Sequence, residues 1–106
     1  MQENFTYIGD LQGQLEKIPD DSIISRTLFR DDNLKGVLFG FAAGQELSEH
    51  TASTPAVLHI LEGRGRLTLG EESREAKPGA WVYMQPNLPH SLYAETPLVM
   101  LLLLIK

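Results

Sequence analysis

Three histidines are the side chains of this 106-residue chain that best suit the binding of a metal or a small ligand. They are His50, His59 and His90. A neutral imidazole offers one ring nitrogen to a transition metal or to a hydrogen-bond donor. The chain has no cysteine, which excludes a thiolate nucleophile, a disulfide and a cysteine-bound zinc. It also lacks a Gly-x-Ser-x-Gly element, so the sequence does not support Ser/His/Asp hydrolysis.

The charge balance argues against two classes of partner. There are 9 basic and 14 acidic residues, which gives a net charge of -5. The basic residues are scattered, whereas nucleic acids and anionic membranes are bound by clustered Lys and Arg. The first residues lack the basic and apolar regions of a signal peptide, so we expect a cytoplasmic protein.

The elements that position the histidines are predicted to be β-strands almost throughout. Short apolar or alternating runs are separated by turn residues at intervals typical of an all-β sandwich or barrel. Residues 11–17 are the one stretch suited to a helical turn, and residues 62–66 are interpreted as a hairpin turn with glycine at positive φ. We expect one domain over residues 1–106, with N-terminal strands in 1–34 and a core in 35–105. The expected strands are residues 22–30, 35–43, 56–62, 64–70, 73–77, 80–85, 90–94 and 98–105.

Two segments resemble the two sequence motifs of the cupin superfamily. In the first, Gly44 is followed by His50 and then by Gly63. In the second, Pro78-Gly79 precedes a hydrophobic strand and the run Pro86-Asn-Leu-Pro-His90. The resemblance covers roughly residues 35–105. It implies a double-stranded β-helix, which is a jelly-roll barrel of two antiparallel sheets.

The same resemblance implies how a metal would be held. In metal-binding cupins the first motif supplies two histidines and a further Glu or His, and the second motif supplies one histidine, to Fe, Mn, Ni, Zn or Cu. His50 and His90 match the first and the fourth of these ligands. Ala52 and Ala56 fall at the second and the third, and neither carries a donor atom. The resemblance therefore implies a divalent transition metal that is weakly bound or absent.

Strand alternation predicts which residues line the barrel. Successive side chains point to opposite faces of a strand. Counted from Ala56, Leu58 and Ile60 point inward, and Ala52 shares a face with His50. We expect Ala52, Ala56, Leu58 and Ile60 to line a pocket beside the histidines.

The C-terminal run and His59 suggest an interface. His59 has the opposite parity to Leu58 and is predicted to point outward. Residues 98–105 are all apolar, too few for the roughly 18–20 needed to cross a bilayer, and they suit a strand buried on both faces. A second subunit would cover the outer face. Because small cupins are commonly dimers, we expect a homodimer in which one sheet of each barrel packs against its mate.

Two functions remain open at this level. The first is a non-catalytic barrel that binds a small molecule, with a degenerate metal site and with His50 and His90 as polar anchors. The second is a metal-dependent enzyme, an oxygenase or an isomerase, that uses a two-histidine centre. General-base chemistry by His90 without a metal is a weaker third possibility. The sequence assigns no catalytic residue, substrate or pathway.

Overall fold

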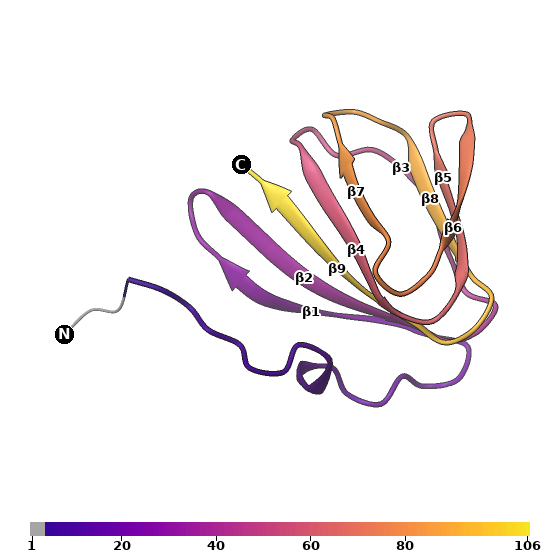
Figure 1. The fold of residues 1–106 in the computed structure, drawn as a ribbon, viewed down its shortest axis with the longest axis horizontal. Helices are drawn as coiled ribbons and strands as arrows, with labels where there is room; N and C mark the ends of the chain where they lie inside the picture. The colour runs from indigo at the N-terminus through magenta and orange to yellow at the C-terminus, as the bar shows by residue number, and fades with distance from the viewer. Residues whose placement is uncertain (1–3) are drawn as a thin grey trace.

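Two antiparallel sheets face each other and enclose the core in the computed structural model, which describes residues 4–106 (Figure 1). The predicted jelly-roll architecture is confirmed. The larger sheet has the strand order β1-β2-β9-β4-β7, and the smaller has the order β3-β8-β5-β6. The strands are β1 Ile23–Arg30, β2 Leu34–Phe41, β3 Glu46–His50, β4 Ala56–Glu62, β5 Gly65–Leu69, β6 Glu72–Ala76, β7 Trp81–Met84, β8 His90–Ala94 and β9 Leu98–Ile105.

Strand β9 occupies the middle of the larger sheet, between β2 and β4. Its inward residues Leu98 and Met100 are almost fully buried in the core cluster. Leu101 and Leu103 alternate with them, point to the outer face of the sheet and are half-buried. The apolar run therefore packs on both faces of the sheet, as expected for a central strand whose outer face is partly covered. The buried core cluster consists of Phe41, Ala56, Leu58, Ile60, Leu67, Ala76, Met84, Leu92, Ala94, Leu98 and Met100.

Two local predictions need correction. Residues 46–50 form strand β3, which the expected strands did not include, because this edge strand is mostly polar and exposed. Residues 62–66 are not a hairpin turn, since β4 and β5 belong to different sheets. Positive φ at Gly63 is nonetheless as predicted, at 88°. This connection carries the chain from one sheet to the other.

The N-terminal segment covers part of the outer face of the larger sheet. In Figure 1 it runs beside β1 and β2, on the side away from the smaller sheet. A Cβ built on Gly40 of β2 would lie 2.5 Å from Leu15 Cδ2 and 2.8 Å from Ile18 Cδ1. The absence of a side chain at Gly40 thus lets the segment approach the sheet. The helical turn predicted over residues 11–17 is present as a short 3-10 helix, η1, at Gln12–Gln14.

Within residues 4–106, no helix is long and apolar enough to cross a membrane.

Candidate functional site

His50 and His90 meet at one end of the barrel. His50 is the last residue of β3, and His90 is the first residue of β8. The two strands are antiparallel neighbours, and the two histidines are register partners. Their ring centroids are 4.1 Å apart, with 57° between the ring planes. Two residues 40 positions apart in sequence are thus brought into ring contact by strand pairing.

A β-bulge in β3 shapes this site. Leu47 is the partner of Leu92, whereas His50 is the partner of His90, so β3 has one residue more than β8 in this interval. In a regular strand Leu47 and His50 would point to opposite faces, because they are three residues apart. The extra residue restores a common direction, and both side chains line the same small cavity. Leu47 was not predicted as a site residue, since strict alternation hides a bulge.

The hydrogen bonds of the two rings determine which nitrogen is free. His50 Nδ1 lies 2.8 Å from the carbonyl oxygen of Ser48, and His90 Nδ1 lies 2.9 Å from that of Leu88. A carbonyl oxygen only accepts, so each Nδ1 carries a proton and donates it. In the neutral ring the lone pair then belongs to Nε2. Both imidazoles are therefore fixed in the tautomer that offers Nε2 to a ligand.

The cavity beside the two rings is small and mostly apolar. Its volume is about 10 Å³, which matches the room that one water molecule requires. His90 is only 6% exposed, whereas His50 is open to solvent. A single atom or ion fits in this cavity, and anything larger must project past His50 toward solvent. The cavity is lined by Leu47, His50, Leu58, Leu67, His90, Ser91, Leu92, Met100 and Leu102.

The pKa of His90 is lowered from its ordinary value of 6.5, chiefly because burial penalises the imidazolium. The hydrogen bond to Leu88 acts in the opposite direction, and positive charge on His50 lowers the pKa further. His90 is thus kept neutral at physiological pH, with its Nε2 lone pair available. A neutral second imidazole suits metal ligation or hydrogen-bond acceptance.

This lowered pKa predicts an acid-sensitive fold. The unfolded chain takes up a proton at position 90 near pH 6.5, whereas the folded chain does so only at lower pH. The stabilising effect of neutral His90 is therefore complete above pH 6.5 and is lost as the pH falls toward the folded pKa. Urea unfolding at successive pH values should show a smaller decline in the His90→Gln variant, with His59→Gln as the control. An NMR titration in which His90 protonates at or above 6.5 would contradict this expectation.

The residues predicted to form a pocket lie in three different places. Leu58 lines the cavity beside the histidines. Ala56 and Ile60 are buried in the core cluster, at 2% and 0% exposure. Ala52 lies in the connection after β3, where its carbonyl oxygen accepts a hydrogen bond from Asn87 N at 2.7 Å. The role of these four residues in ligand binding stays a prediction. His59 points outward, with Trp81 and Leu101 as its register partners.

The donor set is too small for an ordinary catalytic metal. Among residues 4–106, no group of three or more His, Cys, Asp or Glu side chains is placed to hold a metal ion. Catalytic zinc normally has three protein ligands, and non-haem iron commonly has two histidines and a carboxylate. His50 and His90 supply two nitrogens only. They fit a weak two-nitrogen site completed by water or ligand, and not the full ligand set of a metal enzyme.

Comparisons with known proteins agree with the fold of the structure. A sequence profile of the cupin domain matches residues 37–105. An uncharacterized protein of Methanocaldococcus jannaschii is 32% identical over 81 residues, and the match covers 71% of this chain and 65% of that protein. The chain thus spans slightly less than two thirds of this relative.

Solved structures are similar over nearly the whole chain. A conserved protein of unknown function from Streptococcus pyogenes has a TM-score of 0.82 and 29% identity, over 100% of this chain and 90% of that one. A cupin superfamily protein from Desulfitobacterium hafniense has a TM-score of 0.83 and 21% identity, over 90% and 86%. The latter likeness shows the fold alone.

Proposed function

Since the chain belongs to the cupin domain family, we propose that it binds a small organic molecule at the mouth of the barrel, held by His50 and His90. The observation that carries this proposal is the shared tautomer of the two rings. Each Nδ1 is engaged by a backbone carbonyl two residues earlier. Two Nε2 atoms are therefore left to one ligand.

The geometry restricts how such a ligand is bound. The cavity of about 10 Å³ beside the rings admits one oxygen atom. A hydroxyl group suits this position, because its O–H donates to the Nε2 atom of the neutral His90. The remainder of the molecule lies toward solvent beside His50, which is exposed. The ligand is thus a small molecule that carries a hydroxyl group and enters with this group inward.

A single transition-metal ion is the second candidate, and the free Nε2 pair favours it as well. Imidazole nitrogen is a good ligand for Zn, Cu, Ni and Fe. With two protein nitrogens the ion would depend on water or on the organic molecule for its other ligands. Such an ion would polarise a bound oxygen as a Lewis acid, while His50 and His90 would hold and orient it. This arrangement corresponds to the metal-dependent enzyme of the alternative function.

A ligand screen with matched histidine variants tests the proposal. Small alcohols and hydroxy acids are added to tag-free protein, and the unfolding temperature is measured. We expect at least one compound to raise it by several degrees, as a ligand that binds only the folded state must. The effect should disappear in His50→Ala/His90→Ala and persist in His59→Ala, whose side chain lies on the outer face.

Elemental analysis of the same proteins separates the two candidates. A metal present in one equivalent in the unmodified protein, and absent from His50→Ala/His90→Ala, favours the metal centre. Ligand stabilisation that survives chelation favours direct binding by the imidazoles. If no compound and no metal depends on the two histidines, the proposed function is wrong.

A further inference from the structure

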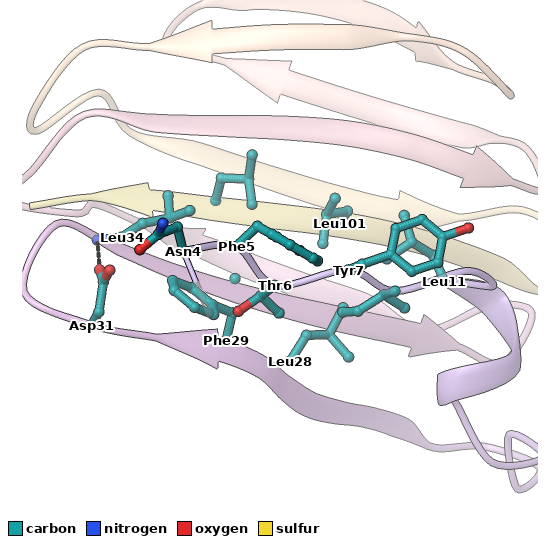
Figure 2. A pocket seen from close by; sticks show the side chains of 13 residues that line it. Asn4, Phe5, Thr6, Tyr7, Leu11, Leu28, Phe29, Asp31, Leu34 and Leu101 are labelled. Carbon is teal, nitrogen blue, oxygen red and sulfur yellow. Dashed lines mark hydrogen bonds between the residues drawn. The ribbon is translucent and has the colours of Figure 1, made fainter. Parts of the chain in front are cut away.

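Met100 brings a third kind of donor atom to the cavity beside the two histidines. It lies on β9, in the middle of the larger sheet, and lines the same cavity as His50 and His90 of the smaller sheet. Its neighbour Leu101 lines the groove between residues 4–11 and the outer face of the larger sheet (Figure 2). Because successive side chains of a strand alternate, Met100 points the other way, into the barrel. Met100 is 1% exposed, so its thioether sulfur is shielded from water.

The other residues that line the cavity add no strong donor. Ser91 alternates with His90 and Leu92 along β8, so its hydroxyl is directed to the outer face of the smaller sheet. The remaining lining residues are leucines. Within residues 4–106, an ion in this cavity therefore meets two imidazoles and one thioether, and no carboxylate completes the set.

This donor set disagrees with the divalent metal that the family resemblance implies. Ala52 and Ala56 fall at two of the four ligand positions, and zinc or non-haem iron generally needs a further nitrogen or carboxylate. A thioether instead selects Cu(I), a soft ion that is stable with few ligands. Cu(II) is disfavoured as well, because it prefers a square-planar set of nitrogen and oxygen ligands.

Burial of the cavity also favours an ion of single charge. His90 is 6% exposed, and the cavity of about 10 Å³ has room for one atom. The free energy needed to take an ion out of water rises with the square of its charge, so a divalent ion costs about four times as much as a monovalent one. Among the residues that the structure describes, no carboxylate joins the two histidines to offset that cost.

From these observations we infer that the cavity is a site for one Cu(I) ion, bound by Nε2 of His50, Nε2 of His90 and the sulfur of Met100. Such a site rests on the proposed function, because the same pair of Nε2 atoms binds the ion. It narrows the metal candidate to one ion and adds a ligand from the opposite sheet. The bound ion joins β9 to β3 and β8 across the end of the core.

Competition for Cu(I) tests this site. Cu(I) is titrated without oxygen into the full chain beside a coloured Cu(I) chelator, whose absorbance reports how much ion the protein takes. We expect one equivalent to bind to the unmodified protein, and none to His50→Ala/His90→Ala. Met100→Leu should weaken binding by about tenfold or more, since even the hydrogen-bond partner of a metal ligand contributes that much. Binding of Zn²⁺ should not change in Met100→Leu, because zinc does not depend on a thioether.

Met84→Leu is the matched control for this substitution. Met84 is also buried in the core cluster, at 2% exposure, but it is not among the residues that line the cavity. Leucine is close to methionine in volume, so the core stays packed in both variants. Urea unfolding without metal should therefore show similar stability for the two, while only Met100→Leu loses affinity for Cu(I).

X-ray absorption at the copper edge identifies the sulfur ligand directly. We expect a sulfur scatterer in the unmodified protein and in Met84→Leu, and its loss in Met100→Leu, which a role of Met100 in packing alone would not produce. No binding of Cu(I), or binding that Met100→Leu does not weaken, overturns the copper site. A hydroxyl compound that still stabilises the protein through the two histidines then leaves the proposed function in place. If neither ion nor compound depends on the histidines, both are wrong.

Discussion

Replacing Gly63 with alanine is expected to destabilise the fold by about 3–5 kcal/mol, which is the range of the most damaging single substitutions. Gly63 has a φ of 88°, and a Cβ there would overlap the carbonyl oxygen of Pro97 and lie 2.7 Å from Leu98 Cα. The left-handed conformation alone costs an L-residue about 1–2 kcal/mol. The remainder comes from displacing backbone atoms at the start of β9, where no flexible side chain can yield.

Gly44→Ala is the control for this prediction. Gly44 has a similar φ of 83°, but no atom lies within 4 Å of a Cβ built there. Its replacement should cost only the conformational term, about 1–2 kcal/mol. Urea unfolding of both variants measures the difference. Equal losses in the two would show that the close approach to Pro97 and Leu98 has no energetic importance.

Ala52→His is expected to raise the affinity for Zn²⁺ or Ni²⁺ by roughly tenfold or more, because zinc sites generally use at least three protein ligands. The resemblance to metal-binding cupins places a ligand at this position, two residues after His50. The connection that carries Ala52 is tied to the one before β8 by the hydrogen bond from Asn87 N to Ala52 O. A histidine at position 52 therefore starts from backbone already held near the loop that leads to His90.

Isothermal titration of the metal into each variant measures this gain. Ser53→His adds the same imidazole one residue farther along and serves as the control. Ala56 is the less suitable test, because a carboxylate at this 2%-exposed core position would be buried without a partner. If Ala52→His and Ser53→His bind the metal equally, Ala52 does not occupy a ligand position.

Much of the fold was predictable because local pattern and long-range packing agree. The strand predicted over residues 22–30 is found at Ile23–Arg30, and the run at 98–105 is found as β9. In both segments, the residue types that favour a strand also pack against neighbouring strands. Strand β3 was missed because it is held at the sheet edge by pairing with β8, and its own polar sequence carries little strand signal.

The sequence singles out the two histidines, and not how they meet in the fold. His50 and His90 were identified from sequence spacing, whereas their contact depends on register and on the bulge after Leu47. Alternation correctly placed Leu58 inward and His59 outward. Alternation could not show whether Ala56 and Ile60 face an open pocket or closely packed core side chains. That depends on how the side chains of both sheets fill the space between them. The groove between residues 4–11 and the outer face of the larger sheet has no sequence pattern, because its two sides come from distant segments.

Alternate residues of strand β9 line two separate surfaces of the molecule. Met100 and Leu102 line the cavity beside the histidine pair, while Leu101 and Leu103 line the groove between residues 4–11 and the outer face of the larger sheet. A shift of this strand alters both surfaces at once, because consecutive residues of a packed strand cannot move independently. The leucine methyl groups of β9 can therefore report, by NMR, on a change at either surface.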